Sequence, residues 1–228
     1  MGKLIYSSIM SVDGFTVDAA GHFNWSAPDE VLHAFVNEVS RPLGTYLYGR
    51  RMYGVMSVWQ TLDTADEPAV MADYQAIWRA ADKIVYSSTL TEPSTPRTRI
   101  EPFFDADAVW ALKQSTDADI SIGGPGIAAH AIRAGLVDEY QLFVSPIAVG
   151  GGTPFFPSDA RVPSPFSTTA ASRPGPSTSV TLLLVSAKVS RAAGRSGSDE
   201  AAPVRRQIRA GGVRRLRTGC EAVTRCGR

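Results

Sequence analysis

Apolar residues along this chain follow two spacings, one typical of β-strands and the other of helices. Short β-favouring runs that stop at glycine, serine or proline predict strands over residues 4–10, 45–48, 83–86, 120–122 and 140–149. Helical spacing, or a composition that permits a helix, covers residues 28–39, 70–81, 105–114 and 127–134. Strands that alternate with helices predict an α/β fold with a mostly parallel central sheet and flanking helices. The stretch 90–99, rich in proline and threonine, is predicted to be a surface loop.

The last quarter of the chain has a different composition. Beyond Pro157 it is rich in Ser, Thr, Pro, Ala, Gly and Arg, and only residues 180–189 are typical of a strand. Residues 187–228 carry 11 Lys and Arg against 3 Asp and Glu, which leaves 12 and 19 in residues 1–186. The net charge of +1 therefore combines an acidic body with a basic tail. We expect one domain over residues 1–189 and a disordered tail over residues 190–228.

Composition excludes several classes of protein. The longest apolar run, residues 180–185, is far shorter than the roughly 20 residues that cross a bilayer, so we expect a cytoplasmic protein. The cysteines, Cys220 and Cys226, both lie in the tail, and the three histidines lack the spacing of a metal site. Redox chemistry in the body would therefore need a bound cofactor, and we expect no metal. An acidic body also argues against a nucleic-acid surface there.

The sharpest local motif is a strand, a glycine turn and a helix. Gly123, Gly124 and Gly126 follow the predicted strand, and Ile127 and Ala128 open the helix. Glycines let a backbone approach a phosphate, to which a helix N-terminus offers unpaired N–H groups. The alternative is a tight turn that needs glycine only for its backbone angles. The motif also fits G-x-G-x-x-A, but it comes too late in the chain for an ordinary Rossmann unit.

Two other predicted strands end in groups that bind anions. Gly49, Arg50 and Arg51 follow one strand, and paired guanidinium groups suit a phosphomonoester such as the 2′-phosphate of NADPH. Ser87 and Ser88 follow the other, where hydroxyls suit phosphate or ribose. A solvated helix start and a turn cap are the simpler alternatives. Three such strand ends together predict a ligand site at the carboxyl edge of the sheet.

Three carboxylates near the first strand and first helix are candidates for acid–base or substrate-binding roles. Asp13 precedes Gly14, so the alternative role for its side chain is to stabilise a turn. Asp29 and Glu30 open the first predicted helix, and their alternative role is to complement the helix dipole.

Several of these motifs, in their order along the chain, resemble the dihydrofolate-reductase-like superfamily. They are Ser11-Val12-Asp13-Gly14-Phe15, Trp25-Ser26-Ala27-Pro28-Asp29-Glu30, Gly49-Arg50-Arg51, Val85-Tyr86-Ser87-Ser88, Ile122-Gly123-Gly124-Pro125-Gly126 and Val137-Asp138-Glu139-Tyr140 followed by Gly150-Gly151-Gly152-Thr153-Pro154. The resemblance covers residues 3–157. Ser-x-Asp-Gly and Gly-Gly-Gly-x-Pro are most similar to the reductase domain of the bifunctional riboflavin-biosynthesis deaminase/reductase and its stand-alone bacterial relatives. No deaminase zinc motif is present.

The resemblance implies a three-layer dihydrofolate-reductase-like fold, a homodimer, and an NADPH-dependent reductase of the dihydrofolate reductase or 5-amino-6-(5-phosphoribosylamino)uracil reductase type. It places Arg50, Arg51, Ser87 and Ser88 at the 2′-phosphate end of NADPH, and residues 123–128 at the pyrophosphate. Ile9 and Thr16 would contact the nicotinamide. Glu30, or Asp29 next to it, would bind a small pterin-like or ribosylaminopyrimidine-like substrate.

Two alternatives remain open for the function, and two for the tail. The chain could be a nucleotide-binding module without productive chemistry, or could associate with nucleic acid through its basic tail. The tail departs from the family, and its composition resembles either an out-of-frame translation of GC-rich DNA or an added basic arm.

Overall fold

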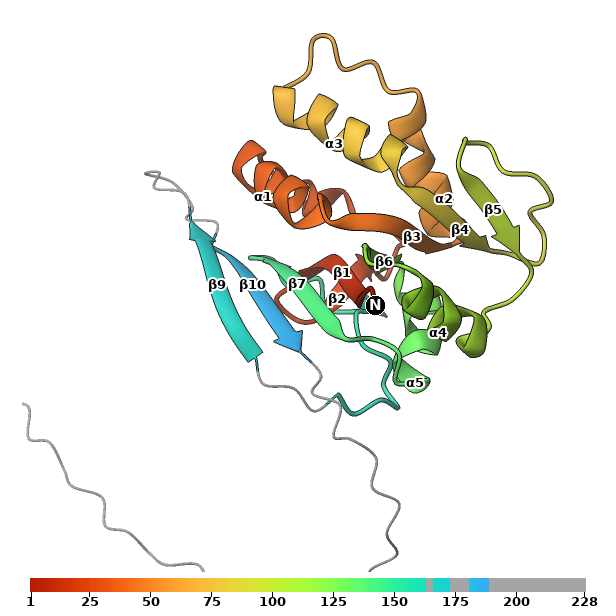
Figure 1. The fold of residues 1–228 in the computed structure, drawn as a ribbon. Helices are drawn as coiled ribbons and strands as arrows, with labels where there is room; N and C mark the ends of the chain where they lie inside the picture. The colour runs from red at the N-terminus through yellow and green to blue at the C-terminus, as the bar shows by residue number, and fades with distance from the viewer. Residues whose placement is uncertain (163–165, 173–180, 189–228) are drawn as a thin grey trace, which may run out of the picture. The chain divides into compact units, whose positions relative to one another are not determined.

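Six parallel strands form the centre of the sheet, and two antiparallel strands extend one side of it (Figure 1). The computed structural model describes residues 1–162, 166–172 and 181–188, all within one compact unit, Met1–Arg191. The order in the large sheet is β5-β4-β3-β6-β1-β7-β10-β9, and β2 pairs with β8 in a small second sheet. The strands are β1 Leu4–Ser11, β2 Phe15–Asp18, β3 Leu43–Gly49, β4 Asp82–Tyr86, β5 Thr98–Glu101, β6 Asp119–Gly123, β7 Glu139–Ser145, β8 Gly152–Pro154, β9 Phe166–Ser172 and β10 Thr181–Lys188.

Helices cover both faces of this sheet, which confirms the predicted three-layer α/β fold (Figure 1). The helices are α1 Glu30–Ser40, α2 Arg50–Met56, α3 Ala69–Ala80, α4 Ala106–Ser115 and α5 Pro125–Arg133, with short 3-10 turns at Asn24–Ser26 and Ser57–Gln60. In the described part of the chain, no helix has the length and apolar content needed to cross a membrane.

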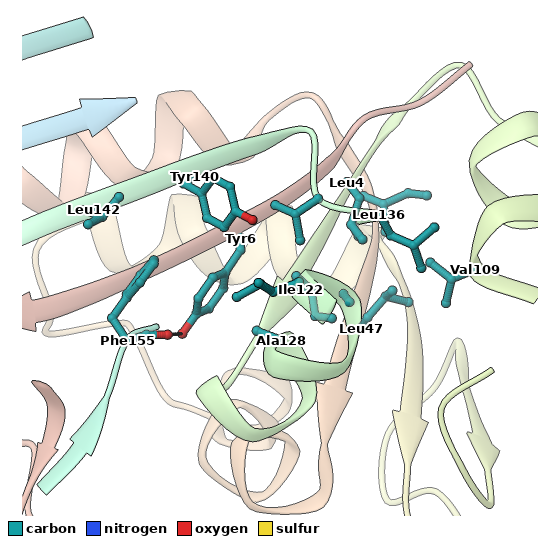
Figure 2. Packing of buried hydrophobic residues seen from close by; sticks show 14 of the residues in the cluster. Leu4, Tyr6, Leu47, Val109, Ile122, Ala128, Leu136, Tyr140, Leu142 and Phe155 are labelled. Carbon is teal, nitrogen blue, oxygen red and sulfur yellow. Dashed lines mark hydrogen bonds between the residues drawn. The ribbon is translucent and has the colours of Figure 1, made fainter. Parts of the chain in front are cut away.

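Alternation along the strands divides the core into two halves. Leu4, Tyr6 and Ile122 point to the face covered by α4 and α5, where Figure 2 shows them packed with Val109 and Ala128. The Tyr6 ring stacks on that of Phe155 at 4.1 Å between centroids, and its hydroxyl donates to the Phe155 carbonyl. On the other face, Tyr48 and Val85 pack with Trp78 of α3. Both faces of the parallel strands are therefore buried.

The structure corrects the sequence prediction at two edge strands. The predicted loop 90–99 runs into β5, which pairs with β4 at the edge of the sheet. A single apolar residue, Ile100, stands among polar ones there, so periodicity gives no strand signal. β9 was also not predicted, because its Ser-, Thr- and Ala-rich sequence is typical of a loop.

β10 confirms the strand predicted within 180–189. β7 ends at Ser145, before the predicted end at residue 149, because Pro146 lacks the N–H that a sheet ladder needs. The predicted tail, residues 190–228, lies outside the described residues.

Lys83 on β4 is buried, with its Nζ 4.0 Å from the centre of the Trp78 ring and without a hydrogen-bond partner among the described residues. Burial, and secondarily the charge of Arg97, lower the pKa of Lys83 to about 8. The Lys83 amine therefore binds its proton less tightly in the folded chain than in the unfolded chain. Stability is reduced below pH 8, and the loss is relieved as the pH rises from about 8 to about 10.5.

We expect Lys83→Met to raise the free energy of unfolding at pH 7 by about 1–2 kcal/mol, a value that allows for solvent screening. The gain should shrink above pH 10, where the wild-type amine is neutral in both states. Urea unfolding at the two pH values measures this difference. Lys3→Met, which removes an exposed lysine, is the control and should not raise the free energy of unfolding at pH 7. An equal gain at both pH values would assign the effect to packing rather than charge.

Candidate functional site

The anion-binding groups predicted from the sequence meet at one edge of the sheet. Gly49 at the end of β3 pairs with Tyr86 at the end of β4, and Tyr48 pairs with Gly123 at the end of β6. The motifs that follow these strands are therefore neighbours at the carboxyl edge, although they are far apart in the sequence. Open α/β sheets bind their ligands at this edge.

A cavity of about 500 Å³ opens between these strand ends. It contains four residues of the predicted set, Arg50, Ser87, Ser88 and Ile127. Its remaining lining residues are Tyr86, Thr89, Pro102, Phe103, Phe104 and His130. The cavity thus has polar groups that suit a phosphate and an aromatic wall that suits a planar ring.

The aromatic wall was not predicted from the sequence. The Phe104 ring stacks on His130 of α5 at 5.7 Å between centroids, and it lies 5.4 Å from the Tyr86 ring. Phe103 beside it is 69% exposed, which is unusual for so large an apolar side chain. Two consecutive aromatic residues just after a strand were the available signal. They were not recognised because β5 itself was not predicted.

Arg50 and Arg51 have different surroundings, although the sequence predicted one shared role. Arg50 lines the cavity just described and also a second one of about 340 Å³, whereas Arg51 lines only the second. The other residues of the second cavity are Tyr53, Gly54, Leu90 and Ser94. Neither guanidinium forms an ion pair with any residue in the described ranges. Of the two, Arg50 is the one grouped with Ser87 and Ser88.

The phenol oxygen of Tyr53 ties the second cavity to the loop before β5. It accepts hydrogen bonds from the Ser94 backbone N–H at 2.9 Å and the Ser94 hydroxyl at 3.0 Å, and it lies 2.9 Å from the Thr95 hydroxyl. Burial alone would raise the pKa of Tyr53, but these hydrogen bonds outweigh it and lower the pKa below its usual value. The loop is thus held against α2 beside both arginines.

The three glycines of the turn after β6 are present for different reasons. A Cβ on Gly123 would lie 2.8 Å from the Tyr48 ring, so packing requires glycine there. Gly124 caps α5 with φ +95°, a conformation that favours glycine. A Cβ on Gly126 would meet nothing within 4 Å, and its φ is not in the positive region. The purely structural alternative therefore accounts for Gly123 and Gly124 but not for Gly126, whose exposed backbone remains available to a ligand.

Ile9 and Thr16 lie farther along the same edge. β1 continues past the end of β6, so that Ile9 pairs only with Phe143 of β7, and its side chain is half-buried. Thr16 on β2 is buried, and its hydroxyl donates to the Thr153 carbonyl of β8 at 3.1 Å. Neither residue lines the two cavities.

The two predicted substrate carboxylates differ in their contacts. Asp29 is the N-cap of α1 and accepts a hydrogen bond from the Leu32 N–H at 2.8 Å, which is the helix-start role given as its alternative. Glu30 is exposed, and its carboxylate has no hydrogen bond or ion pair within the described part of the chain. Glu30 is therefore the freer of the two to bind a substrate. Among the described residues there is also no cluster of three or more His, Cys, Asp or Glu side chains that could hold a metal.

Comparison with known proteins agrees with this architecture. A family model described as the RibD C-terminal domain matches residues 2–171. An uncharacterized protein of Bacillus subtilis (strain 168), YyaP, is 27% identical over 157 residues, which cover 68% of this chain and 80% of that protein.

Three solved structures share the fold. A protein of Shewanella sp. PV-4 assigned to riboflavin biosynthesis has a TM-score of 0.56 at 20% identity, over 83% of this chain and 99% of that one. A pyrimidine reductase-like protein of Corynebacterium diphtheriae has 0.56 at 15% identity, over 84% and 93%. A diaminohydroxyphosphoribosylaminopyrimidine deaminase/5-amino-6-(5-phosphoribosylamino)uracil reductase of Thermotoga maritima has 0.53 at 15% identity, over 82% of this chain and 56% of that longer one.

Proposed function

Because the chain belongs to the RibD C-terminal domain family, we propose that it is a reductase that uses NADPH to reduce a small heterocyclic substrate. Two of the structural relatives are named for reductases of pyrimidines, which favours a ribosylaminopyrimidine-like substrate. A pterin-like ring is the other member of the proposed class.

One observation carries this proposal: the spatial order of the strands puts the predicted subsites in a single line. The order β4-β3-β6-β1 sets Ser87 beside Arg50, Arg50 beside the glycine turn, and the glycine turn beside the end of β1. Neighbouring strands are about 4.8 Å apart, so this line spans about 14 Å. Along this line lie a phosphate site, then a backbone anion site, then an apolar strand end. An extended dinucleotide requires these three sites in that spatial order.

The residues fit NADPH at the end that distinguishes it from NADH. Arg50 and the hydroxyls of Ser87 and Ser88 share one cavity, and such groups suit the 2′-phosphate. The aromatic wall of Phe104 and His130 suits the adenine ring. At Gly126, an open space next to unpaired helix N–H groups suits the pyrophosphate.

The protein's own part in the reaction is to bind and to orient. NADPH, when bound, supplies the hydride. Arg50, Ser87 and the glycine turn would hold the phosphate groups of the cofactor and so fix its register along the sheet edge. Glu30 accepts hydrogen bonds from ring N–H groups of the substrate and so orients it. The half-buried Ile9 keeps water from one side of the reacting ring.

Arg50→Ala is expected to reduce the affinity for NADPH about 10- to 150-fold, which corresponds to a charge-assisted contact of about 1.5–3 kcal/mol. NADH affinity should not change, because NADH lacks the 2′-phosphate. Calorimetric titration of both cofactors measures the preference. Arg51→Ala is the matched control, because Arg51 lies outside the larger cavity. This variant should keep most of the preference for NADPH over NADH. Equal affinities of the wild type for the two cofactors would contradict the assignment.

Activity itself is tested by following NADPH oxidation with a panel of pterins and ribosylaminopyrimidines. Turnover with one member of the panel, abolished by Glu30→Gln, supports the proposed reductase. Tight NADPH binding without oxidation of any member would instead favour the nucleotide-binding module without chemistry.

A further inference from the structure

Asp13, in the turn between β1 and β2, holds a loop that lies more than 130 residues away in the sequence. Its carboxylate accepts a hydrogen bond from the Gly150 N–H at 2.7 Å and another from the Val149 N–H at 3.2 Å. Both donors belong to the loop between β7 and β8. The carboxylate therefore joins two loops at the carboxyl edge, whereas the sequence suggested a role within its own turn.

The turn around Asp13 is stabilised by another residue. The Ser11 side chain is buried, donates to the Phe15 carbonyl at 3.2 Å and accepts from the Phe15 N–H at 3.0 Å. The Gly14 N–H also donates to the Ser11 carbonyl at 3.0 Å. These bonds close the turn, and the Ser11 side chain also interacts with the Asp13 carboxylate, whose backbone hydrogen bonds go to the other loop.

The partner loop has few other means of fixing its position. Gly150, Gly151 and Gly152 are consecutive and all have positive φ. A Cβ on Gly150 or Gly151 would meet nothing within 4 Å, so side-chain packing does not anchor them. Gly152, in contrast, is pressed against the Val17 carbonyl of β2, where a Cβ would collide. The start of the glycine loop is thus held by Asp13, and its end by the β2–β8 sheet.

Both loops border the end of β1, where the proposed function places the reduced ring of the cofactor. β2 carries Thr16, whose hydroxyl bonds to Thr153 just after the glycine loop. The Val12 N–H donates to the Ile147 carbonyl at 2.9 Å, so the two loops also meet on the side nearer β1. The Asp13 bridge, the Val12–Ile147 bond and the Thr16–Thr153 bond therefore join the same two segments of the chain.

We propose that Asp13 is a positioning residue for the nicotinamide end of the cofactor site: its carboxylate fixes the glycine loop 150–152 against the β1–β2 turn. This inference rests on the proposed function. Asp13 does not touch the reacting atoms. It fixes the two loops before the cofactor binds, and so lowers the cost of ordering them on binding.

The hydrogen bonds that the Asp13 carboxylate accepts favour its ionised form. The hydrogen bond with the Ser11 side chain, followed by those from the Gly150 and Val149 N–H groups, holds the pKa of Asp13 below its usual value. Its carboxyl group therefore stays ionised above the ordinary aspartate range. Substitution, rather than acidification, is the way to remove the charge.

Asp13→Asn tests the proposal because the amide has nearly the same shape but lacks the charge. Two ligands are titrated by calorimetry: NADPH, which reaches both ends of the site, and 2′,5′-ADP, which occupies only the adenosine end. We expect the affinity for NADPH to fall about tenfold, while that for 2′,5′-ADP changes less than about twofold. Amide hydrogen exchange at Val149 and Gly150 should accelerate in the variant without any ligand.

Asp18→Asn is the matched control. Asp18 also accepts two backbone hydrogen bonds, from Ala20 and His22, but both lie within its own turn. It should leave both affinities unchanged. Equal losses of the two affinities in Asp13→Asn, together with a lower melting temperature, would assign Asp13 to general stability and overturn the proposal. Unchanged NADPH affinity would also overturn it. If the wild type binds neither ligand, the proposed function fails first, and the inference fails with it.

Discussion

Gly126→Val is expected to abolish measurable NADPH binding without lowering the melting temperature. Gly126 occupies the first turn of α5, is exposed, and would gain a Cβ that meets nothing within 4 Å. Valine has a higher helix propensity than glycine by a few tenths of a kcal/mol, so the helix should be as stable as before or slightly more so. No structural requirement for glycine at this position is visible in the fold.

The expected loss of binding follows from the backbone N–H groups that glycine, which has no side chain, leaves uncovered. The first N–H groups of a helix have no partner within it, and Pro125 contributes none, so Gly126 and Ile127 supply the free donors of this turn. A branched side chain at 126 would cover them and displace an incoming phosphate. Each charge-assisted hydrogen bond lost costs about 1.5–3 kcal/mol, which for two bonds corresponds to a loss of at least about 150-fold.

Two other glycine variants distinguish a loss of binding caused by a blocked site from one caused by a destabilised fold. Gly124→Val should also lose NADPH, but with a lower melting temperature, since Gly124 has φ +95° and its Cβ would lie 3.2 Å from that of Met52. Gly54→Val fills an open helical position beside the second cavity only, so it should retain binding. Thermal melts and NADPH titration of the three variants provide the comparison. Normal NADPH affinity in Gly126→Val would show that the turn serves the fold alone.

The candidate site could be predicted in part because its polar groups follow strands with a strong apolar pattern. Residues such as Arg50 and Ser87 come directly after buried runs, and parallel strands bring such positions to the same edge. The sequence did not reveal the spatial order of the strands. β6 inserts between β3 and β1, and this insertion sets the glycine turn between the phosphate cavity and the end of β1.

The residues that were missed depend on tertiary contacts. Phe104 and His130 become neighbours only through the packing of α5 beside the segment that follows β5. Likewise, the two arginines are adjacent in sequence, yet one lies between two cavities and the other lines one. The role of Asp13 was assigned to its own turn because local hydrogen bonds are the ones that a sequence pattern describes.

Composition is also a weak guide at the edges of a sheet. β5 and β9 are the two edge strands of the large sheet, and each pairs with only one neighbouring strand. Both contain few apolar residues. Backbone pairing, which any sequence without proline can form, stabilises such strands more than side-chain burial does. β10 was recognised because it lies between β9 and β7 and is rich in leucine and valine.

Removing β10 is expected to have the largest effect on stability of any change considered for this chain. β10 pairs antiparallel with β7 from Leu183 opposite Val144 to Lys188 opposite Glu139, and its other edge pairs with β9. β7 carries buried Tyr140, Leu142 and Phe143. A chain that ends at residue 180 would leave the edge of β7 without its partner. Each backbone hydrogen bond lost from this ladder costs about 0.5–1.5 kcal/mol net, and the sum is comparable with the whole stability of a typical domain, about 5–15 kcal/mol.

A pair of truncations places the boundary of the domain. The chain that ends at residue 189 should keep the melting temperature and NADPH affinity of the full chain, because residues 190–228 contain too few apolar residues to offset the entropy of folding. The chain that ends at residue 180 should aggregate, since an exposed apolar strand edge pairs with other chains. Size-exclusion chromatography and thermal melts measure both outcomes.

The family match ends at residue 171, before β10 begins, so the second truncation also tests whether this strand belongs to the fold. A soluble, equally stable chain ending at residue 180 would show that β10 adds nothing and would favour an out-of-frame origin for everything beyond it.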